Sequence, residues 1–230
     1  MIAALLVASA LAQTASPQPG TDPSPADERA LAVLERTKTT RATYALYGWN
    51  WIQDRDGSLR EGWSAEFNSG TRHRVETPEV RVVADCDTQT GTALNVTTGE
   101  RFSGRQVAQA ACGISTARPI FEVTWLGAGP SRFGPVDRLH IADEADERFY
   151  VVDPDGILVG AEIYGVTEPW CLRMEALAVE RRLPEGDIFS EQSLDRSVVP
   201  RRYTFTPNRY EGDLWTPGRN CPLMSPDTAD

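Results

Sequence analysis

Hydrophobic and polar residues alternate along most of the chain after Thr43, and this period of two predicts β-strands. The clearest stretch is 43–54, in which Tyr47, Trp49 and Trp51 fall on one face of the expected strand. Further strands are predicted at 62–70, 72–78, 79–86, 92–99, 120–127, 136–143, 148–156, 157–165 and 171–183. The last of these is ambiguous between strand and helix, and its position after a run of strands favours strand.

Two Asp-Gly pairs, Asp56-Gly57 and Asp155-Gly156, are typical of hairpin turns. Short strands at even spacing with such turns between them are expected to pair antiparallel. The pattern therefore predicts a curved sheet or a partly open barrel.

Two segments interrupt the strands with a helical pattern. Residues 26–42 place Leu31 and Leu34 on one apolar stripe, and residues 104–113 form a shorter helical stretch near the middle of the chain. We therefore predict an α+β fold, a curved antiparallel sheet or half-barrel that is partly covered by an N-terminal helix and a short mid-chain helix.

The domain boundaries follow from composition. Residues 1–12 are uncharged and end in Ala-Leu-Ala, which predicts a signal peptide, with a buried helix as the alternative. Residues 13–26 are predicted to be a flexible linker, 27–199 a single domain, and 200–230 a mostly irregular C-terminal tail. The apolar start is too short for a transmembrane span, which needs about 20 residues. We thus expect a periplasmic or secreted protein.

The four cysteines agree with export. In an oxidising compartment an even number favours disulfides, and four cysteines allow three pairings. Short loops close most easily, which favours Cys86–Cys112 and Cys171–Cys221. A zinc site is the competing interpretation, but the cysteines lack C-x-x-C spacing and the chain has only two histidines.

Charge and motifs narrow the chemistry. The formal net charge is −10, which argues against nucleic acid as a partner. No nucleophile motif occurs, and His73 and His140 are expected on exposed strand surfaces. The acidic residues between 137 and 155 are expected at solvated hairpin tips, with a calcium site as the alternative. We predict no catalytic residue, no metal site and no cofactor.

The aromatic residues are the candidate binding residues. Tyr47, Trp49, Trp51, Trp63 and Trp125 come from successive predicted strands. Aromatic side chains that share a face on adjacent strands either fill the core or line a pocket. A curved sheet that few helices cover favours a pocket for an apolar ligand.

The order of these elements resembles the periplasmic lipoprotein carrier (LolA/LolB-like) superfamily. The resemblance lies in the helix at 26–42, the strands, the mid-chain helix, the segment 136–165 and the ending ALAVERRLPEGDIFS at 176–190. It implies a half-barrel closed by helices around an apolar cavity, in a group whose members carry acyl chains or act as envelope sensors. It assigns no family site residue to this chain.

The leading hypothesis is an exported envelope protein that binds an apolar ligand, such as a lipid or acyl chain, in the half-barrel. The first alternative is a protein–protein or sensor module with an envelope protein as its partner, bound by strand edges or by the tail after Pro200. The second alternative is a hydrolase whose site carries no recognised motif. We favour a protein that is not an enzyme.

Overall fold

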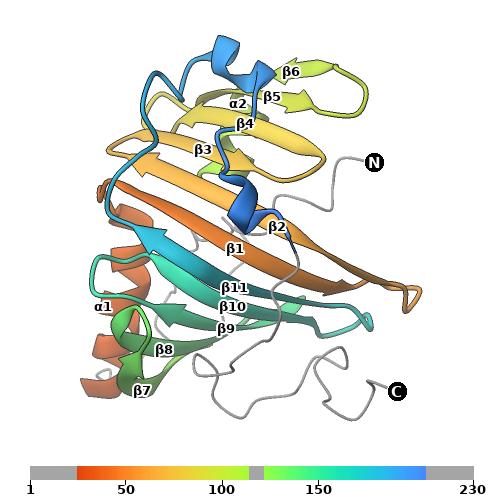
Figure 1. Ribbon diagram of the computed structural model, residues 1–230. Coiled ribbons are helices and arrows are strands. Elements are labelled where there is room, and N and C mark those ends of the chain that lie inside the picture. The colour runs from red at the N-terminus through yellow and green to blue at the C-terminus, as the bar shows by residue number, and fades with distance from the viewer. Residues whose placement is uncertain (1–24, 114–121, 206–230) are drawn as a thin grey trace.

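The structure, a computed structural model, describes residues 25–113 and 122–205. Within these residues eleven strands form one antiparallel sheet (Figure 1). In spatial order they are β6 (Arg101–Ser103), β5 (Thr90–Asn95), β4 (Val80–Asp85), β3 (Arg72–Glu76), β2 (Leu59–Ser69), β1 (Tyr44–Gln53), β11 (Cys171–Glu180), β10 (Leu158–Gly165), β9 (Asp146–Val152), β8 (Gly134–Ala142) and β7 (Glu122–Ser131). Two meanders, β1–β6 and β7–β11, therefore meet where β1 pairs with β11.

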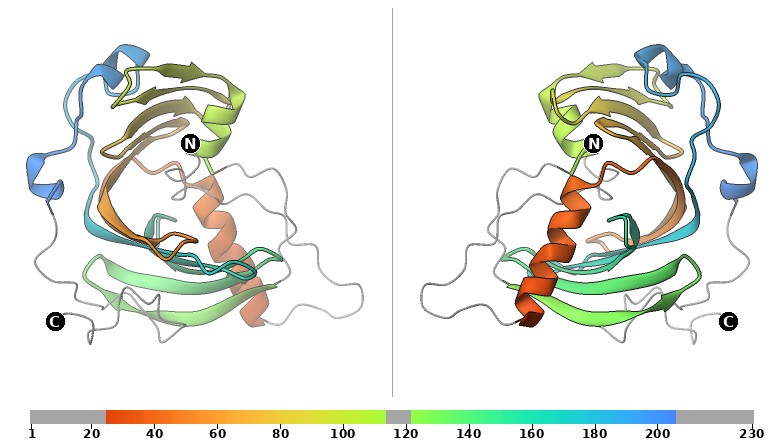
Figure 2. Two further views of the ribbon diagram at one scale, coloured as in Figure 1. Left: turned by 90° about the vertical axis from the view of Figure 1, so that its right-hand side faces the viewer. Right: turned by 90° about the vertical axis from the view of Figure 1, so that its left-hand side faces the viewer.

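The sheet curves strongly, and both helices lie on its concave side (Figure 2). Helix α1 (Pro25–Thr39) packs on β7 and β8, and α2 (Arg105–Ala111) packs on β3, β4 and β5. The predicted α+β half-barrel with two helices is confirmed. The ambiguous segment after Cys171 is strand β11, whereas β6 was missed because it has only three residues.

Helix α1 is held by one apolar stripe and one carboxylate. Val33 and Leu34 are buried in a cluster with residues of β8 to β11, while Leu31, which the sequence placed on the stripe, is exposed. Asp137 of β8 accepts hydrogen bonds from Arg29 at 3.0 Å and from Arg36 at 2.8 Å. The helix is thereby fixed against one end of the concave face.

The β9–β10 hairpin reaches the end of α1 through Gly156. The predicted turn is confirmed, since the Asp153 carboxylate accepts hydrogen bonds from the backbone N–H groups of Asp155 and Ile157. Gly156 has a φ of +85°, and a Cβ there would lie 2.4 Å from the Arg36 carbonyl oxygen. This position therefore requires glycine for two separate reasons.

We expect Gly156→Ala to lower the free energy of unfolding by about 2 kcal/mol, because it adds a backbone clash to an unfavourable φ. Gly57→Ala is the matched control, since Gly57 has a φ of +81° and nothing within 4 Å of its Cβ position. Urea denaturation should show the smaller loss for Gly57→Ala. Equal losses would mean that the contact with α1 carries no cost.

Residues 181–205, which we call the C-terminal strap, cross the outer face of the sheet (Figure 1). The strap contains two short 3₁₀ helices, η2 (Glu191–Asp195) and η3 (Arg201–Tyr203). Ile188 packs among residues of β1 and β2, and Leu194 packs against Val83 and Leu94. The sheet is thus covered on both faces, by helices inside and by the strap outside.

Parts of the predicted organisation fall outside the described residues. These are the signal peptide 1–12, the linker 13–26 except its last two residues, and Cys221. The predicted irregular tail 200–230 begins with packed residues, because the Tyr203 ring stacks on Tyr47 at 4.2 Å. Its remainder, 206–230, is outside the described residues. Among the described residues, no helix is long and apolar enough to cross a membrane.

The expectation of solvated acidic hairpin tips holds for Glu144 and Asp155, which are exposed, but is wrong for four aspartates. Asp137, Asp143, Asp146 and Asp153 are all buried. Each accepts hydrogen bonds from arginine side chains, from turn N–H groups or from both, and these bonds replace the lost hydration. A run of acidic residues in the sequence cannot reveal such partners, since the arginines come from other segments.

Candidate binding cavity

A cavity of about 380 Å³ opens in the middle of the concave face. The two helices pack toward opposite ends of the sheet, and the cavity lies between them over β2, β1, β11 and β10. Its volume falls within the range of about 300–1,000 Å³ that is typical of small-molecule sites. Its lining residues are Asn50, Ile52, Arg60, Glu61, Gly62, Trp63, Ser64, Val75, Thr77, Pro78, Glu79, Ala161, Leu172 and Met174.

One side of the cavity is apolar and continuous with the core. Ile52, Ala161, Leu172 and Met174 belong to the cluster that packs under α1. Thioether and branched aliphatic side chains adapt well to an apolar guest. This wall can contact a hydrocarbon group but offers it no side-chain hydrogen bond.

Small residues on β2 leave the space open. Gly62 pairs with Asn50, and a Cβ on Gly62 would meet only the Pro78 ring, at 3.9 Å. Ser64 follows on the same face of β2, opposite Gly48. A larger residue at position 62 would therefore project into the cavity without a backbone clash.

Two polar side chains offer hydrogen bonds to a guest. Asn50 donates through Nδ2 to the Gly62 carbonyl oxygen at 3.3 Å. Within the described residues, no hydrogen bond involves the Asn50 Oδ1 or Ser64 Oγ atoms. Both atoms remain able to accept hydrogen bonds, and the serine hydroxyl can also donate one.

The charged groups of the cavity are largely neutralised or negative. Arg60 donates two hydrogen bonds to Asp54, and these bonds lower the pKa of Asp54 and raise that of Arg60. Glu61 pairs with Trp51, and its carboxylate accepts a hydrogen bond from Trp49 Nε1 at 3.0 Å on the outer face of the sheet, away from the cavity. The exposed Glu79 has no ion pair with any described residue. Arg60 is the only basic residue in the described lining.

Of the five aromatic residues predicted to bind ligand, Trp63 is among the residues that border the cavity, but it pairs with Trp49 and therefore shares the face of Tyr47, Trp49 and Trp51. Tyr47 lies under the strap, where it contacts Phe67 and Tyr203. Trp49 and Trp51 follow Tyr47 on the same face of β1, whose pairing with β2 is regular. The sequence grouped these three correctly, but their face is the outer one.

Trp125 lies at the far end of the concave face. It packs against the α1 cluster and donates through Nε1 to Asp137 at 3.1 Å. The structure therefore does not gather the five aromatics into one wall, and their role as ligand-binding residues stays a prediction.

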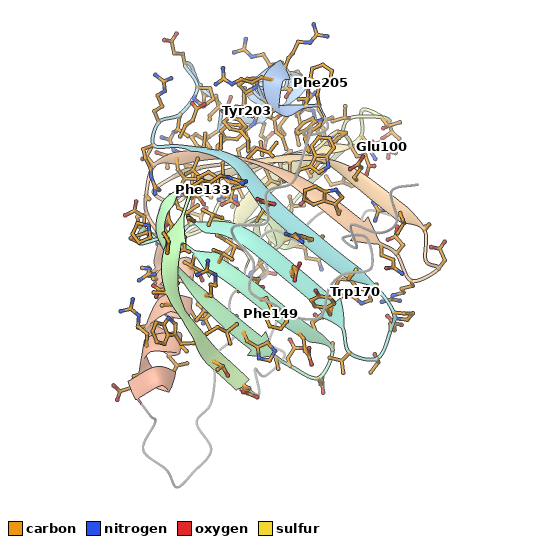
Figure 3. All side chains as sticks on the ribbon, turned by 60° about the horizontal axis from the view of Figure 1, so that its bottom comes forward. Glu100, Phe133, Phe149, Trp170, Tyr203 and Phe205 are labelled. Atoms are coloured by element: carbon orange, nitrogen blue, oxygen red, sulfur yellow. A yellow bond between two sulfur atoms is a disulfide. The ribbon has the colours of Figure 1, made fainter. Side chains whose placement is uncertain are left out.

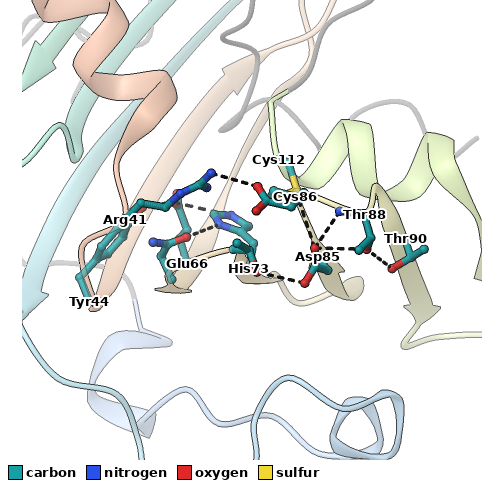
Figure 4. Close-up of a disulfide and its surroundings, with 12 residues drawn as sticks. Arg41, Tyr44, Glu66, His73, Asp85, Cys86, Thr88, Thr90 and Cys112 are labelled. Carbon is teal, nitrogen blue, oxygen red and sulfur yellow. Dashed lines mark hydrogen bonds and ion pairs between the residues drawn. A yellow bond between two sulfur atoms is a disulfide. The ribbon is translucent and has the colours of Figure 1, made fainter.

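A polar cluster lies beyond Ser64 on β2 and beside the Cys86–Cys112 disulfide (Figure 4). The Tyr44 hydroxyl donates to Glu66, whose Oε1 lies 3.6 Å from His73 Nε2. Burial and the Glu66 charge hold the pKa of Tyr44 well above its usual value. The expectation that His73 is exposed is wrong, because Asn68, Glu66 and the surrounding sheet bury it.

A second polar cluster, on the outer face, gave no signal in the sequence. Glu162 of β10 and Arg173 of β11 lie 3.4 Å apart. Burial raises the pKa of Glu162, against the hydrogen bond from Tyr164 and the charge of Arg173. Burial also lowers the pKa of Arg173 to about 10. The two residues are adjacent only because β10 pairs with β11.

His140 lies next to this cluster, on the strand beyond β9. Its ring stacks on that of Phe149, with centroids 4.7 Å apart. Phe149 is labelled in Figure 3. The expectation of an exposed His140 is therefore wrong, since the ring is half-buried. Among residues 25–113 and 122–205, no group of His, Cys, Asp or Glu side chains could hold a metal ion.

The disulfide prediction is confirmed in part. Cys86 and Cys112 are bonded, with their Cα atoms 5.6 Å apart. Cys171 is buried, and its predicted partner Cys221 lies outside the described residues, so this second pairing stays a prediction.

No protein-family model and no curated protein sequence matches the chain. Among solved structures, MucB is similar at 14% identity and a TM-score of 0.44. The match covers 74% of this chain and 64% of the MucB chain, which is less than two thirds of its length. A LolA superfamily protein from Nitrosomonas europaea matches at 9% identity and a TM-score of 0.37, over 72% of this chain and 99% of the other. A putative outer membrane lipoprotein-sorting protein domain from Vibrio parahaemolyticus matches at 7% identity and a TM-score of 0.40, over 74% of this chain and 100% of the other. LolA-like structures are thus among those that the chain resembles, and the likeness concerns the fold alone.

Proposed function

We propose that the protein binds the apolar part of a small amphiphilic molecule, such as an acyl chain, in the concave cavity. The observation that carries this proposal is a cavity of about 380 Å³ with one wall of Ile52, Ala161, Leu172 and Met174. Burying a hydrocarbon chain against such a wall contributes about 0.8 kcal/mol per methylene, before the cost of association.

We further propose that it acts in the periplasm or outside the cell. The Cys86–Cys112 bond supports this location, because structural disulfides persist in oxidising compartments. The predicted signal peptide at residues 1–12 points to the same compartment.

Gly62→Phe tests the site. The added ring would project from β2 into the cavity, so we expect affinity for an alkyl ligand to fall about tenfold or more. The measurement is the fluorescence titration of the apolar dye Nile red, followed by its displacement with lauryl alcohol.

Leu59→Phe is the matched control, since Leu59 is on the same strand, is 62% exposed and does not line the cavity. It should bind like the wild type. Circular dichroism should show that both variants are folded. Wild-type protein that binds neither dye nor alcohol would overturn the proposed function, and unchanged binding by folded Gly62→Phe would overturn the assigned site.

A further inference from the structure

We infer that the cavity accepts alkyl chains with an uncharged, hydrogen-bonding head, such as a hydroxyl, ester or amide, and rejects chains that end in a carboxylate. This inference rests on the proposed function and specifies its ligand class. It follows from the polar groups that the cavity offers and from those that it lacks.

The hydrogen-bonding groups suit an uncharged head. The Asn50 and Ser64 side chains share the concave face of β1 and β2, with Gly62 and Gly48 opposite them in the pairing. The Asn50 Oδ1 and Ser64 Oγ atoms make no hydrogen bond within the described residues. A hydroxyl or amide that enters can replace its bonds to water with bonds to these atoms, so its desolvation is compensated.

A carboxylate would lack a partner of opposite charge. The guanidinium of Arg60 is already bound by both oxygens of Asp54. Arg55, in the adjacent turn, is paired with Glu168 at 2.6 Å. The described lining therefore presents no cation that is free to compensate a second carboxylate, and a desolvated charge without a partner is strongly disfavoured.

The remaining charges of the concave face are negative. Glu79 belongs to the lining, and Glu66 follows Ser64 on the same face of β2, whereas the Glu61 carboxylate lies on the outer face with Trp49. Like charges repel a carboxylate head and select against it even when the chain fits. A carboxylate head is thus disfavoured for two reasons: the described lining offers it no free cation, and nearby carboxylates repel it.

The test compares lauric acid with lauryl alcohol, which share one chain length and differ in the head. Isothermal titration at neutral pH, where the acid is ionised, should show that the alcohol binds about tenfold or more tightly than the acid. Asn50→Leu should lower the affinity for lauryl alcohol and leave the affinity for lauric acid unchanged, because it removes a hydrogen-bond partner that only the neutral head uses.

Glu79→Gln should raise the affinity for lauric acid about threefold and leave that for the alcohol unchanged, by removing a nearby negative charge. Glu185→Gln is the matched control, with the same change in net charge at an exposed residue of the strap. It should alter neither affinity.

Equal affinities, or tighter binding of the acid, would overturn this inference and leave the proposed function standing. A wild-type protein that binds neither ligand would overturn the proposed function itself. An equal gain in acid affinity for Glu79→Gln and Glu185→Gln would show that net charge, and not the cavity, sets the preference.

Discussion

Arg74→Met should lower the free energy of unfolding by about 3–5 kcal/mol, because it removes the hydrogen-bonded cation of the buried Glu76 carboxylate and leaves it the more distant Arg81, whose Nε lies 3.7 Å from Glu76 Oε2. Both side chains are completely buried, and Arg74 Nε lies 2.7 Å from Glu76 Oε1. Burial lowers the pKa of the Arg74 guanidinium, in opposition to Glu76. The cost of desolvating this pair is therefore offset by the attraction between its charges and by its hydrogen bonds.

The loss should extend to the C-terminal strap. Arg74 donates to the carbonyl oxygens of Ile188 at 2.7 Å and Arg196 at 2.9 Å, and to the Ser193 hydroxyl at 2.6 Å. Glu76 accepts a hydrogen bond from the Ser197 hydroxyl at 2.6 Å. One buried ion pair thus organises an irregular segment that has few backbone hydrogen bonds of its own.

Denaturant titration gives the stability change, and amide hydrogen exchange over residues 181–205 shows whether the strap opens. Arg182→Met is the matched control within the strap, since the Arg182 side chain is 84% exposed, and its effect should stay within about 0.5 kcal/mol. Arg74→Met with Glu76→Gln also removes the buried carboxylate charge that has lost its hydrogen-bonded cation, and it should recover part of the loss. A single Arg74→Met variant that keeps wild-type stability and strap protection would contradict this account.

The sequence could predict the sheet because alternation is a local property. The residues on β1 show both the strength and the limit of this signal. Their period of two correctly placed Tyr47, Trp49 and Trp51 together, yet it could not say which face becomes concave. That depends on the curvature of eleven paired strands and on what covers each face within the described residues.

The sequence predicted a pocket in the curved sheet, but it could predict neither the strap nor most of the residues that line the cavity. Arg74 stands in a run with Arg72 and His73 that reads as an exposed strand, and its burial depends on backbone carbonyls more than a hundred residues later. The strap itself has no periodic pattern to reveal it. The cavity arises from Gly62 and Ser64, small residues that carry no motif and matter only because two helices pack elsewhere.

Removing the Cys86–Cys112 disulfide should be the other large effect. The bond joins the turn after β4 to the residue that follows α2, across a sequence separation of 26. Closing a loop of this size stabilises the fold by about 3.5 kcal/mol in the chain-entropy description. We therefore expect Cys86→Ala with Cys112→Ala to lose about 3 kcal/mol in denaturant titration.

The loss should be concentrated in and around α2. A helix of seven residues is too short to be stable alone, and α2 is otherwise held by the buried Ala108 and Ala111 and by hydrogen bonds that Arg105 and Gln109 donate to Gln89. Hydrogen exchange over residues 105–111 should rise more than exchange in β1 or β11. Because Val75 of β3 belongs both to the α2 cluster and to the cavity lining, ligand affinity should also fall, by less than Gly62→Phe reduces it.

A global loss with α2 still protected would mean that the bond acts only on the unfolded chain, as the entropy description holds. Local exposure of α2 with little global change would mean that it holds the helix in place. The double alanine variant separates these two outcomes. Unchanged stability together with unchanged protection of α2 would contradict both, and would show that the buried alanines and the hydrogen bonds to Gln89 suffice to fix the helix beside the cavity.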